Sequence, residues 1–146
     1  MDDRTAALDR ILELVALLGD DMTRGLARDG LTRSRAHVLW ELRRGDPMTQ
    51  RALADALKVS ARTVTGLVDG LVATGFVTRE PHPTDRRATL VTFTPHGVAT
   101  VEALEREQRD FADLLFEGMS NLECFVAGLD EILARLRAHG LTVEVG

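Results

Sequence analysis

The chain has 146 residues, 45% of them apolar, and a net charge of −5. This length and composition are typical of a globular protein with one or two small cores, and no apolar run reaches the roughly 18 residues that a membrane helix needs. The first residues also lack the basic and then apolar layout of a secretory signal, so we expect a cytoplasmic protein with no membrane partner.

The charge is unevenly distributed along the chain. Residues 31–93 carry ten basic and six acidic side chains, a net charge of +4, whereas the remainder of the chain carries −9. A positive middle segment between negative ends is typical of a local phosphate-binding surface. The negative total therefore does not exclude a nucleic-acid partner.

The first 45 residues predict two helices. Apolar residues recur every three or four positions from about residue 5 to residue 28, which predicts a long amphipathic helix whose apolar stripe has no partner nearby in the sequence. Gly30 interrupts this pattern, and Thr32 can cap a second helix that ends at Gly45. The inward-facing residues of this second helix are expected to be Ala36, Val38, Leu39 and Leu42.

Two short helices follow, separated by only two or three residues. Thr49 caps a helix over residues 50–58, and Ser60 caps the next helix, which runs to about Gly75. Helices joined by so short a turn cross steeply, which is the geometry of a helix-turn-helix unit. The first of the two should bury Ala52, Leu53, Ala56 and Leu57.

The helix that begins at Ser60 has two unlike faces. The side opposite its apolar face carries small residues and hydroxyls around Gly66 and Gly70, where a solvated helix would normally carry Glu, Lys and Arg. Small and hydroxyl-bearing residues permit close approach to a DNA groove and contacts with phosphates or thymine methyls; a surface without a role is the alternative. The apolar side consists of Val64, Leu67, Val68, Leu71 and Val72.

A charged hairpin comes next. Residues 76–79 and 88–93 alternate in the manner of strands, and the polar, proline-containing stretch 81–87 between them predicts the hairpin tip. Arg86 and Arg87 would project from this tip and could reach a minor groove, whose negative potential favours arginine. We expect Asp85 to pair with Arg87 or Arg79 and hold that arginine in place.

The last third of the chain returns to long helices. Thr94 caps a helix that has Pro95 at its first position and runs to about Gly118. Residues 120–123 have the spacing of a capping box and start a final helix that ends near Gly140. The apolar stripes of these helices and of the first helix have no partner in the middle segment, so they most simply pack across a two-fold axis between two copies.

Residues 49–97 resemble the core of the MarR family of transcriptional regulators. The most specific part is the Asp-x-Arg wing signature at residues 85–87, followed at the family's usual distance by LVTFTPHG at 90–97. The resemblance implies a mainly α fold with a small β-hairpin wing, in the order four helices, hairpin and two helices. It also implies a homodimer in which residues 31–97 form a winged helix-turn-helix DNA-binding lobe and residues 1–30 and 98–146 form a helical dimerisation region.

The resemblance further implies which residues contact double-stranded DNA. The helix after Ser60 would enter the major groove and the wing the minor groove, with Arg79 and Asp85 orienting the wing. Family members often carry a basic residue where this chain has Gly66 and Gly70, so the wing should contribute a larger share of the binding. The candidate DNA-binding residues are Thr49, Gln50, Arg51, Ser60, Arg62, Thr63, Thr65, Arg86 and Arg87.

A ligand-responsive repressor is the expected function. A dimer would present two recognition helices about 34 Å apart, one DNA turn, which predicts a pseudo-palindromic operator. The resemblance implies a pocket for a small aromatic or phenolic effector where the dimerisation helices meet the DNA-binding lobe. The candidate lining residues, each of which could instead be simple core, are Leu14, Leu18, His37, Trp40, Phe111 and Leu115.

Two alternatives stay open. A protein-interaction module that keeps the fold without binding DNA is one, given the glycines on the reading face. A thiol redox sensor through Cys124 is the other, although no Lys, Arg or His adjoins this residue in sequence to favour its thiolate.

Enzymatic and metal-dependent functions are not expected. The sequence has no phosphate loop and no nucleophile elbow, so the chain is not predicted to be an enzyme. The histidines show no metal-ligand spacing on any one predicted helix, so neither a metal nor another cofactor is expected. These histidines are His37, His82, His96 and His139.

Overall fold

The computed structural model describes residues 2–143. Met1 and residues 144–146, which belong to the expected dimerisation region, lie outside the described residues. Within residues 2–143, no helix is both long and apolar enough to cross a membrane. The order of elements confirms the mainly helical winged fold that the sequence predicts: α1 (Asp3–Arg28), α2 (Arg33–Gly45), β1 (Met48–Thr49), α3 (Gln50–Leu57), α4 (Ala61–Ala73), β2 (Val77–Pro81), β3 (Thr89–Phe93), α5 (Pro95–Phe116) and α6 (Leu122–Ala138).

Hydroxyl side chains begin four of the helices. Each accepts a hydrogen bond from the backbone N–H three residues later, which satisfies a donor that the first turn of a helix leaves free. The expected capping box at residues 120–123 is wrong, because α6 begins after Asn121, which makes no side-chain cap hydrogen bond. The four hydroxyl caps are those that the sequence predicts: Thr32, Thr49, Ser60 and Thr94.

The turn between α3 and α4 is short enough to cross the two helices steeply. Lys58 closes α3 in the left-handed conformation, with φ of 56°, and the N–H of Val59 donates to the Ala54 carbonyl at 3.0 Å. This arrangement buries Ala54 in place of Ala56, which the sequence pattern wrongly placed inside and which is exposed. The helix-turn-helix unit itself is present as predicted.

The wing contains a third strand that the sequence pattern does not reveal. β3 pairs antiparallel with β2 on one side and with β1 on the other, which gives the order β1-β3-β2. The register aligns Val77 with Phe93 and Pro81 with Thr89, so residues 82–88 form the hairpin tip. β1 has only two residues, too few for an alternation pattern, and it exists through its pairing with β3.

One apolar core holds the lobe together. Leu26 of α1 and Val101 of α5 are buried in it, so both long helices are anchored on the lobe. Val72, which the sequence pattern placed on the inner side of α4, is 37% exposed. The largest fully buried side chains come from α2, α3, α4, the sheet and the start of α5: Phe76, Leu39, Leu42, Leu53, Leu71, Val38, Val64, Val68, Val77, Val91 and Val101.

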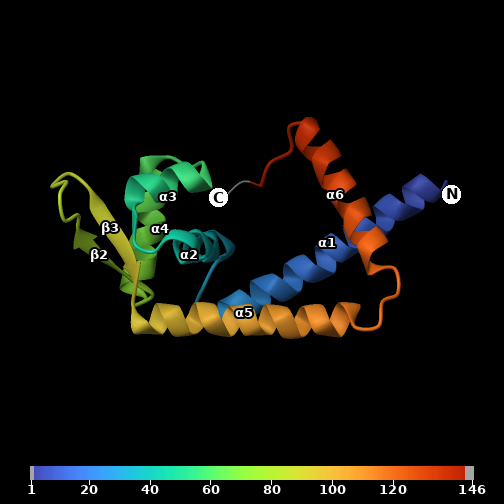
Figure 1. Cartoon of the computed structure of the whole chain (residues 1–146), viewed down its shortest axis with the longest axis horizontal. Coiled ribbons are helices and arrows are strands. Elements are labelled where there is room, and N and C mark those ends of the chain that lie inside the picture. Colours follow the sequence, from blue (N-terminus) through green and yellow to red (C-terminus); the bar gives the residue numbers. More distant parts are fainter. Residues whose placement is uncertain (1, 144–146) are drawn as a thin grey trace.

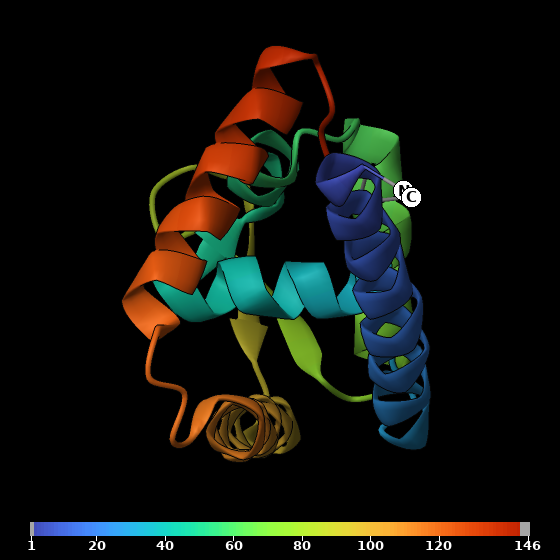
Figure 2. The ribbon, with the colours of Figure 1, turned by 90° about the vertical axis from the view of Figure 1, so that its right-hand side faces the viewer.

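The long helices α1 and α5 extend away from the lobe and diverge from one another, and α6 turns up from the far end of α5 (Figures 1 and 2). Among the described residues, every large apolar side chain that is exposed, except Val72, lies in α1, α5 or α6 or just beyond their ends. α6 has no buried residue, and its Leu129, Ile132 and Leu133 are 38–45% exposed. Within one chain, therefore, the apolar stripes of these helices do not cover each other.

A tight contact joins α5 to the turn that follows α4. Gly75, with φ of 82°, ends α4, and Oγ1 of Thr94 donates to the Gly75 carbonyl at 2.6 Å. The backbone N–H of Thr94 donates to the Phe76 carbonyl at 3.1 Å. A Cβ added at Gly97 would lie 2.0 Å from that same carbonyl oxygen, so glycine is required for this close approach.

We predict that Gly97→Ala lowers the free energy of unfolding by about 1–3 kcal/mol, because the added methyl group meets backbone that cannot rotate away. Gly66→Ala is the matched control: its added Cβ would meet no atom within 4 Å, so the better helix propensity of alanine should add up to about 1 kcal/mol. Urea unfolding at one fixed protein concentration measures both. A Gly97→Ala midpoint equal to that of wild type would contradict the contact.

Candidate nucleic-acid interface

The start of α4 presents polar side chains to solvent because the other side of the helix faces the core. Oγ of Ser60 accepts a hydrogen bond from the Thr63 N–H and donates one to Oγ1 of Thr63, both at 3.0 Å. Oγ1 of Thr65 donates to the Ala61 carbonyl at 2.8 Å. Arg62 lies among these hydroxyls and is also exposed. This surface therefore combines small hydrogen-bonding groups with one long cation.

The two glycines of α4 have different surroundings. A Cβ added at Gly66 would meet nothing within 4 Å, so this position opens outward. A Cβ added at Gly70 would lie 2.5 Å from Nη2 of Arg35, so the guanidinium of this α2 residue covers Gly70. Of the two glycines that the sequence places on the reading face, Gly66 is therefore open and Gly70 is covered by Arg35.

Arg79 of β2 links α3 to α4. Its Nε donates to Oε1 of Gln50 at 2.6 Å, and its Nη2 lies 2.6 Å from Oδ1 of Asp69. The same Nη2 donates to the Thr65 carbonyl at 3.3 Å. Nε2 of Gln50 donates in turn to Oγ1 of Thr65 at 3.4 Å. These four residues, which we call the Arg79 network, hold the start of α3, the middle of α4 and β2 in one arrangement.

Asp85 shapes the wing tip through two hydrogen bonds, one to its side chain and one from its backbone. Its Oδ1 accepts a hydrogen bond from the backbone N–H of Arg87 at 3.0 Å, and Nδ1 of His82 accepts one from the backbone N–H of Asp85 at 3.0 Å. Of the two partners expected for Asp85, it contacts Arg87, through the backbone N–H of that residue, and not Arg79, whose side chain belongs to the Arg79 network. The side chains of Arg86 and Arg87 are exposed at the tip.

The structure gathers the predicted DNA-binding residues on three adjoining parts, namely the start of α3, the start of α4 and the wing. Figure 1 places these parts at one end of the molecule, away from α6 and the N-terminal end of α1. Thr49 and Gln50 are half-buried, and the Thr49 hydroxyl is engaged in capping α3. The other seven are exposed: Arg51, Ser60, Arg62, Thr63, Thr65, Arg86 and Arg87.

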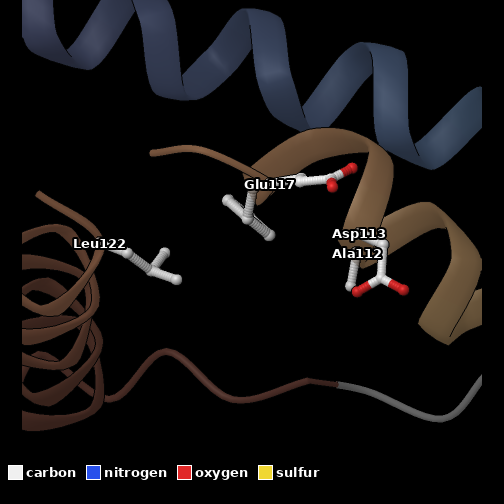
Figure 3. A pocket seen from close by; sticks show the side chains of 5 residues that line it. Ala112, Asp113, Glu117 and Leu122 are labelled. Carbon is white, nitrogen blue, oxygen red and sulfur yellow. The ribbon is translucent and has the colours of Figure 1, made fainter. Parts of the chain in front are cut away.

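The residues predicted to line an effector pocket are only partly covered in a single chain. His37 and Trp40 of α2 are half-buried, whereas Leu14, Leu18, Phe111 and Leu115 of the long helices are exposed. A surface hollow lies elsewhere, where α5 turns toward α6, and none of the six predicted residues lines it. Its lining consists of Ala112, Asp113, Phe116, Glu117 and Leu122 (Figure 3).

Comparisons with known proteins identify the family. Residues 29–88 match the sequence model of the MarR family. The multiple antibiotic resistance protein MarR of Salmonella typhimurium is 33% identical over 107 residues, which cover 73% of this chain and 73% of that protein. The chain belongs to the MarR family.

Two further proteins show a similar likeness. The HTH-type transcriptional repressor YetL of Bacillus subtilis is 34% identical over 86 residues, which cover 58% of this chain and 52% of YetL. The crystal structure of the MarR family transcription regulator SP03579 shares the fold, with a TM-score of 0.73 at 23% identity over 93% of both chains. The protein is thus a DNA-binding transcriptional regulator, and the MarR family is a family of regulators and not of enzymes.

Sequence reasoning missed the partners of two arginines. Asp69 stands alone as an acid among the small residues and hydroxyls of α4, and this isolation is a signal that a cation from another element neutralises it. Nothing in the sequence pairs Arg35 with Gly70, because their approach depends on how α2 crosses α4. Both contacts join residues that are far apart in the sequence, so the periodicity and spacing of residues cannot reveal them.

Proposed function

We propose that this MarR-family protein is a homodimeric, ligand-responsive repressor that binds a pseudo-palindromic operator through α4 and the wing. The convergence of the polar start of α4 with the exposed Arg86 and Arg87 at one end of the molecule carries this proposal (Figure 1). The name of YetL, a transcriptional repressor, supports repression as the mode of action.

In this proposal α4 enters the major groove and the wing enters the minor groove. Arg62 reaches guanine or phosphate, and the hydroxyls of α4 reach phosphates or base edges. Arg86 and Arg87 reach the narrow groove, whose negative potential favours arginine. The start of α3, with Thr49, Gln50 and Arg51, lies along the DNA backbone. Asp85 sets the wing turn, whereas Arg79 acts through the Arg79 network.

The same proposal divides the chain into two functional regions. Residues 31–97 form the DNA-binding lobe, and residues 1–30 and 98–146 form the dimerisation region. The concentration of exposed large apolar side chains on α1, α5 and α6 supports this division. Because a monomeric protein seldom exposes so many apolar side chains together, a second copy is the occupant that covers them.

The test uses a duplex that the wild-type protein selects from a random pool of DNA. We predict that the protein binds this selected duplex with an affinity that falls steeply as the salt concentration rises. Arg87→Ala should weaken this binding about tenfold and reduce the salt slope by about one, because one minor-groove cation is lost. Arg10→Ala, which removes an exposed arginine of α1, is the matched control and should bind as wild type does. Fluorescence anisotropy measures all three.

Two results would count against this assignment. An unchanged affinity of the Arg87→Ala protein would remove the wing from the DNA contact. If the wild-type protein bound no duplex even at low salt, the alternative of a protein-interaction module with the same fold would be favoured.

We predict a dimer at the concentrations used for DNA binding, and dissociation of that dimer by Leu133→Glu. Leu133 is 45% exposed in one chain, and a carboxylate there would be buried without a partner in the dimer. Ala134→Glu is the matched control, because Ala134 is exposed and lies about 100° around α6 from Leu133, outside the apolar stripe. Sedimentation equilibrium measures the monomer–dimer equilibrium of each protein. A wild-type monomer, or equal dissociation of both variants, would contradict the proposed interface.

The effector site is proposed between α1, α2 and α5, with Leu14, Leu18, His37, Trp40, Phe111 and Leu115 as its lining. The half-burial of Trp40 supports this location for the site, since a partly exposed aromatic ring can stack on an aromatic ligand. Trp40 is also the only tryptophan, so a phenolic compound that releases DNA should change its fluorescence. Release of DNA without any change in fluorescence would exclude Trp40 from the site.

A redox mechanism through Cys124 is not proposed. The residue is exposed on α6, and exposure is the one observation in its favour. A reactive thiol also needs a positive surrounding that favours the thiolate.

A further inference from the structure

Asp69 is an electrostatic liability on the proposed DNA-binding surface. It follows Thr65 by four residues on α4, so the two side chains lie on the same face of the helix, and its side chain is 60% exposed. A carboxylate on a helix that faces a DNA groove repels phosphate unless a cation neutralises it. In this structure that cation is Arg79, with Nη2 at 2.6 Å from Oδ1 of Asp69.

The hydrogen bonds of Arg79 are directed into the protein. Its Nε is taken by Gln50, and its Nη2 is shared between Asp69 and the Thr65 carbonyl. Its side chain is only 29% exposed. An arginine of β2 whose donors are held in this way by α3 and α4 is placed to fix those elements and not to contact a phosphate.

Gln50 is held in place by the same arginine. Its Oε1 accepts from Nε of Arg79 at 2.6 Å while its Nε2 donates to Oγ1 of Thr65. The amide therefore has a defined orientation at the start of α3, directly beside α4. Loss of Arg79 would remove one of the two hydrogen bonds of the Gln50 amide and leave Asp69 unpaired at the same time.

We propose that Arg79 is a positioning residue of the DNA-binding surface, which neutralises Asp69 and fixes Gln50 against α4. DNA affinity then depends on Arg79 because it neutralises Asp69, and not on contact between Arg79 and a phosphate. This inference rests on the proposed binding of DNA through α4 and the wing.

The experiment compares wild type with Arg79→Gln, Asp69→Asn and the double variant on the selected duplex, over a range of salt concentrations. Arg79→Gln should bind at least about tenfold more weakly, because Asp69 becomes an unpaired charge facing DNA. Asp69→Asn should bind at least as tightly as wild type. The double variant, whose two amides can still hydrogen-bond, should return to within about threefold of wild type with an unchanged salt slope.

Arg135→Gln is the matched control, since Arg135 also forms an ion pair with an acidic partner, Glu131, but on α6. It should leave DNA affinity unchanged. Thermal unfolding of every variant distinguishes a loss of DNA affinity from a loss of stability. If Arg79→Gln does not fold, the Asp69→Asn variant still tests the inference.

The inference is overturned if the double variant stays as weak as Arg79→Gln and its salt slope falls by about 0.9, because Arg79 is then a phosphate ligand. A tenfold loss of affinity in Asp69→Asn would overturn it as well. A wild-type protein that binds no duplex at low salt gives a different result, since it removes the proposed function and this inference with it.

Discussion

The contact between Gly97 and the Phe76 carbonyl is the constraint on which the rest of the structure depends. Three parts meet there: the end of α4, the beginning of the wing and the beginning of α5. Phe76 is buried in the core of the lobe and stacks on His96 with ring centroids 4.8 Å apart. Since packed backbone and side chains do not deform continuously, α5 cannot shift at this point without moving the segment that joins α4 to the wing. Any signal that rearranges the long helices therefore has a short physical route to the DNA-binding surface.

The DNA-binding surface depends on how its charges are arranged more than on how many there are. The whole chain is negative, and its positive charge is concentrated in residues 31–93. Within that segment, Arg79 is occupied by Asp69 and Gln50, and the guanidinium of Arg35 lies over Gly70. The arginines left facing solvent near the proposed groove contacts are those of the wing tip, the start of α4 and the start of α3. Two kinds of arginine thus coexist in the lobe, some that order the surface and some free to meet phosphate.

Sequence patterns predicted what is decided locally and failed where distant segments meet. The caps at Thr32, Thr49 and Ser60 were predictable because a hydroxyl and an N–H three residues later are neighbours in any helix start. β1 was not predictable, because two residues become a strand only by pairing with β3, more than forty residues later. Asp85 was expected to pair with Arg87 or Arg79, both near it in sequence; it contacts the backbone of Arg87, whereas the fold places Asp69 beside Arg79. The exposed start of α4 and the exposed wing arginines agree with the sequence prediction, and their contact with DNA is the part that remains a proposal.

The most direct test of the account is to map the DNA-binding surface residue by residue. Backbone amide chemical shifts of isotope-labelled protein would be followed by nuclear magnetic resonance as the selected duplex is added. We expect the largest changes at residues 60–66 of α4 and at residues 82–88 of the wing, with smaller changes at the start of α3 and little change along α6. Changes centred on α6 or on the outer half of α1, with α4 and the wing unaffected, would contradict it.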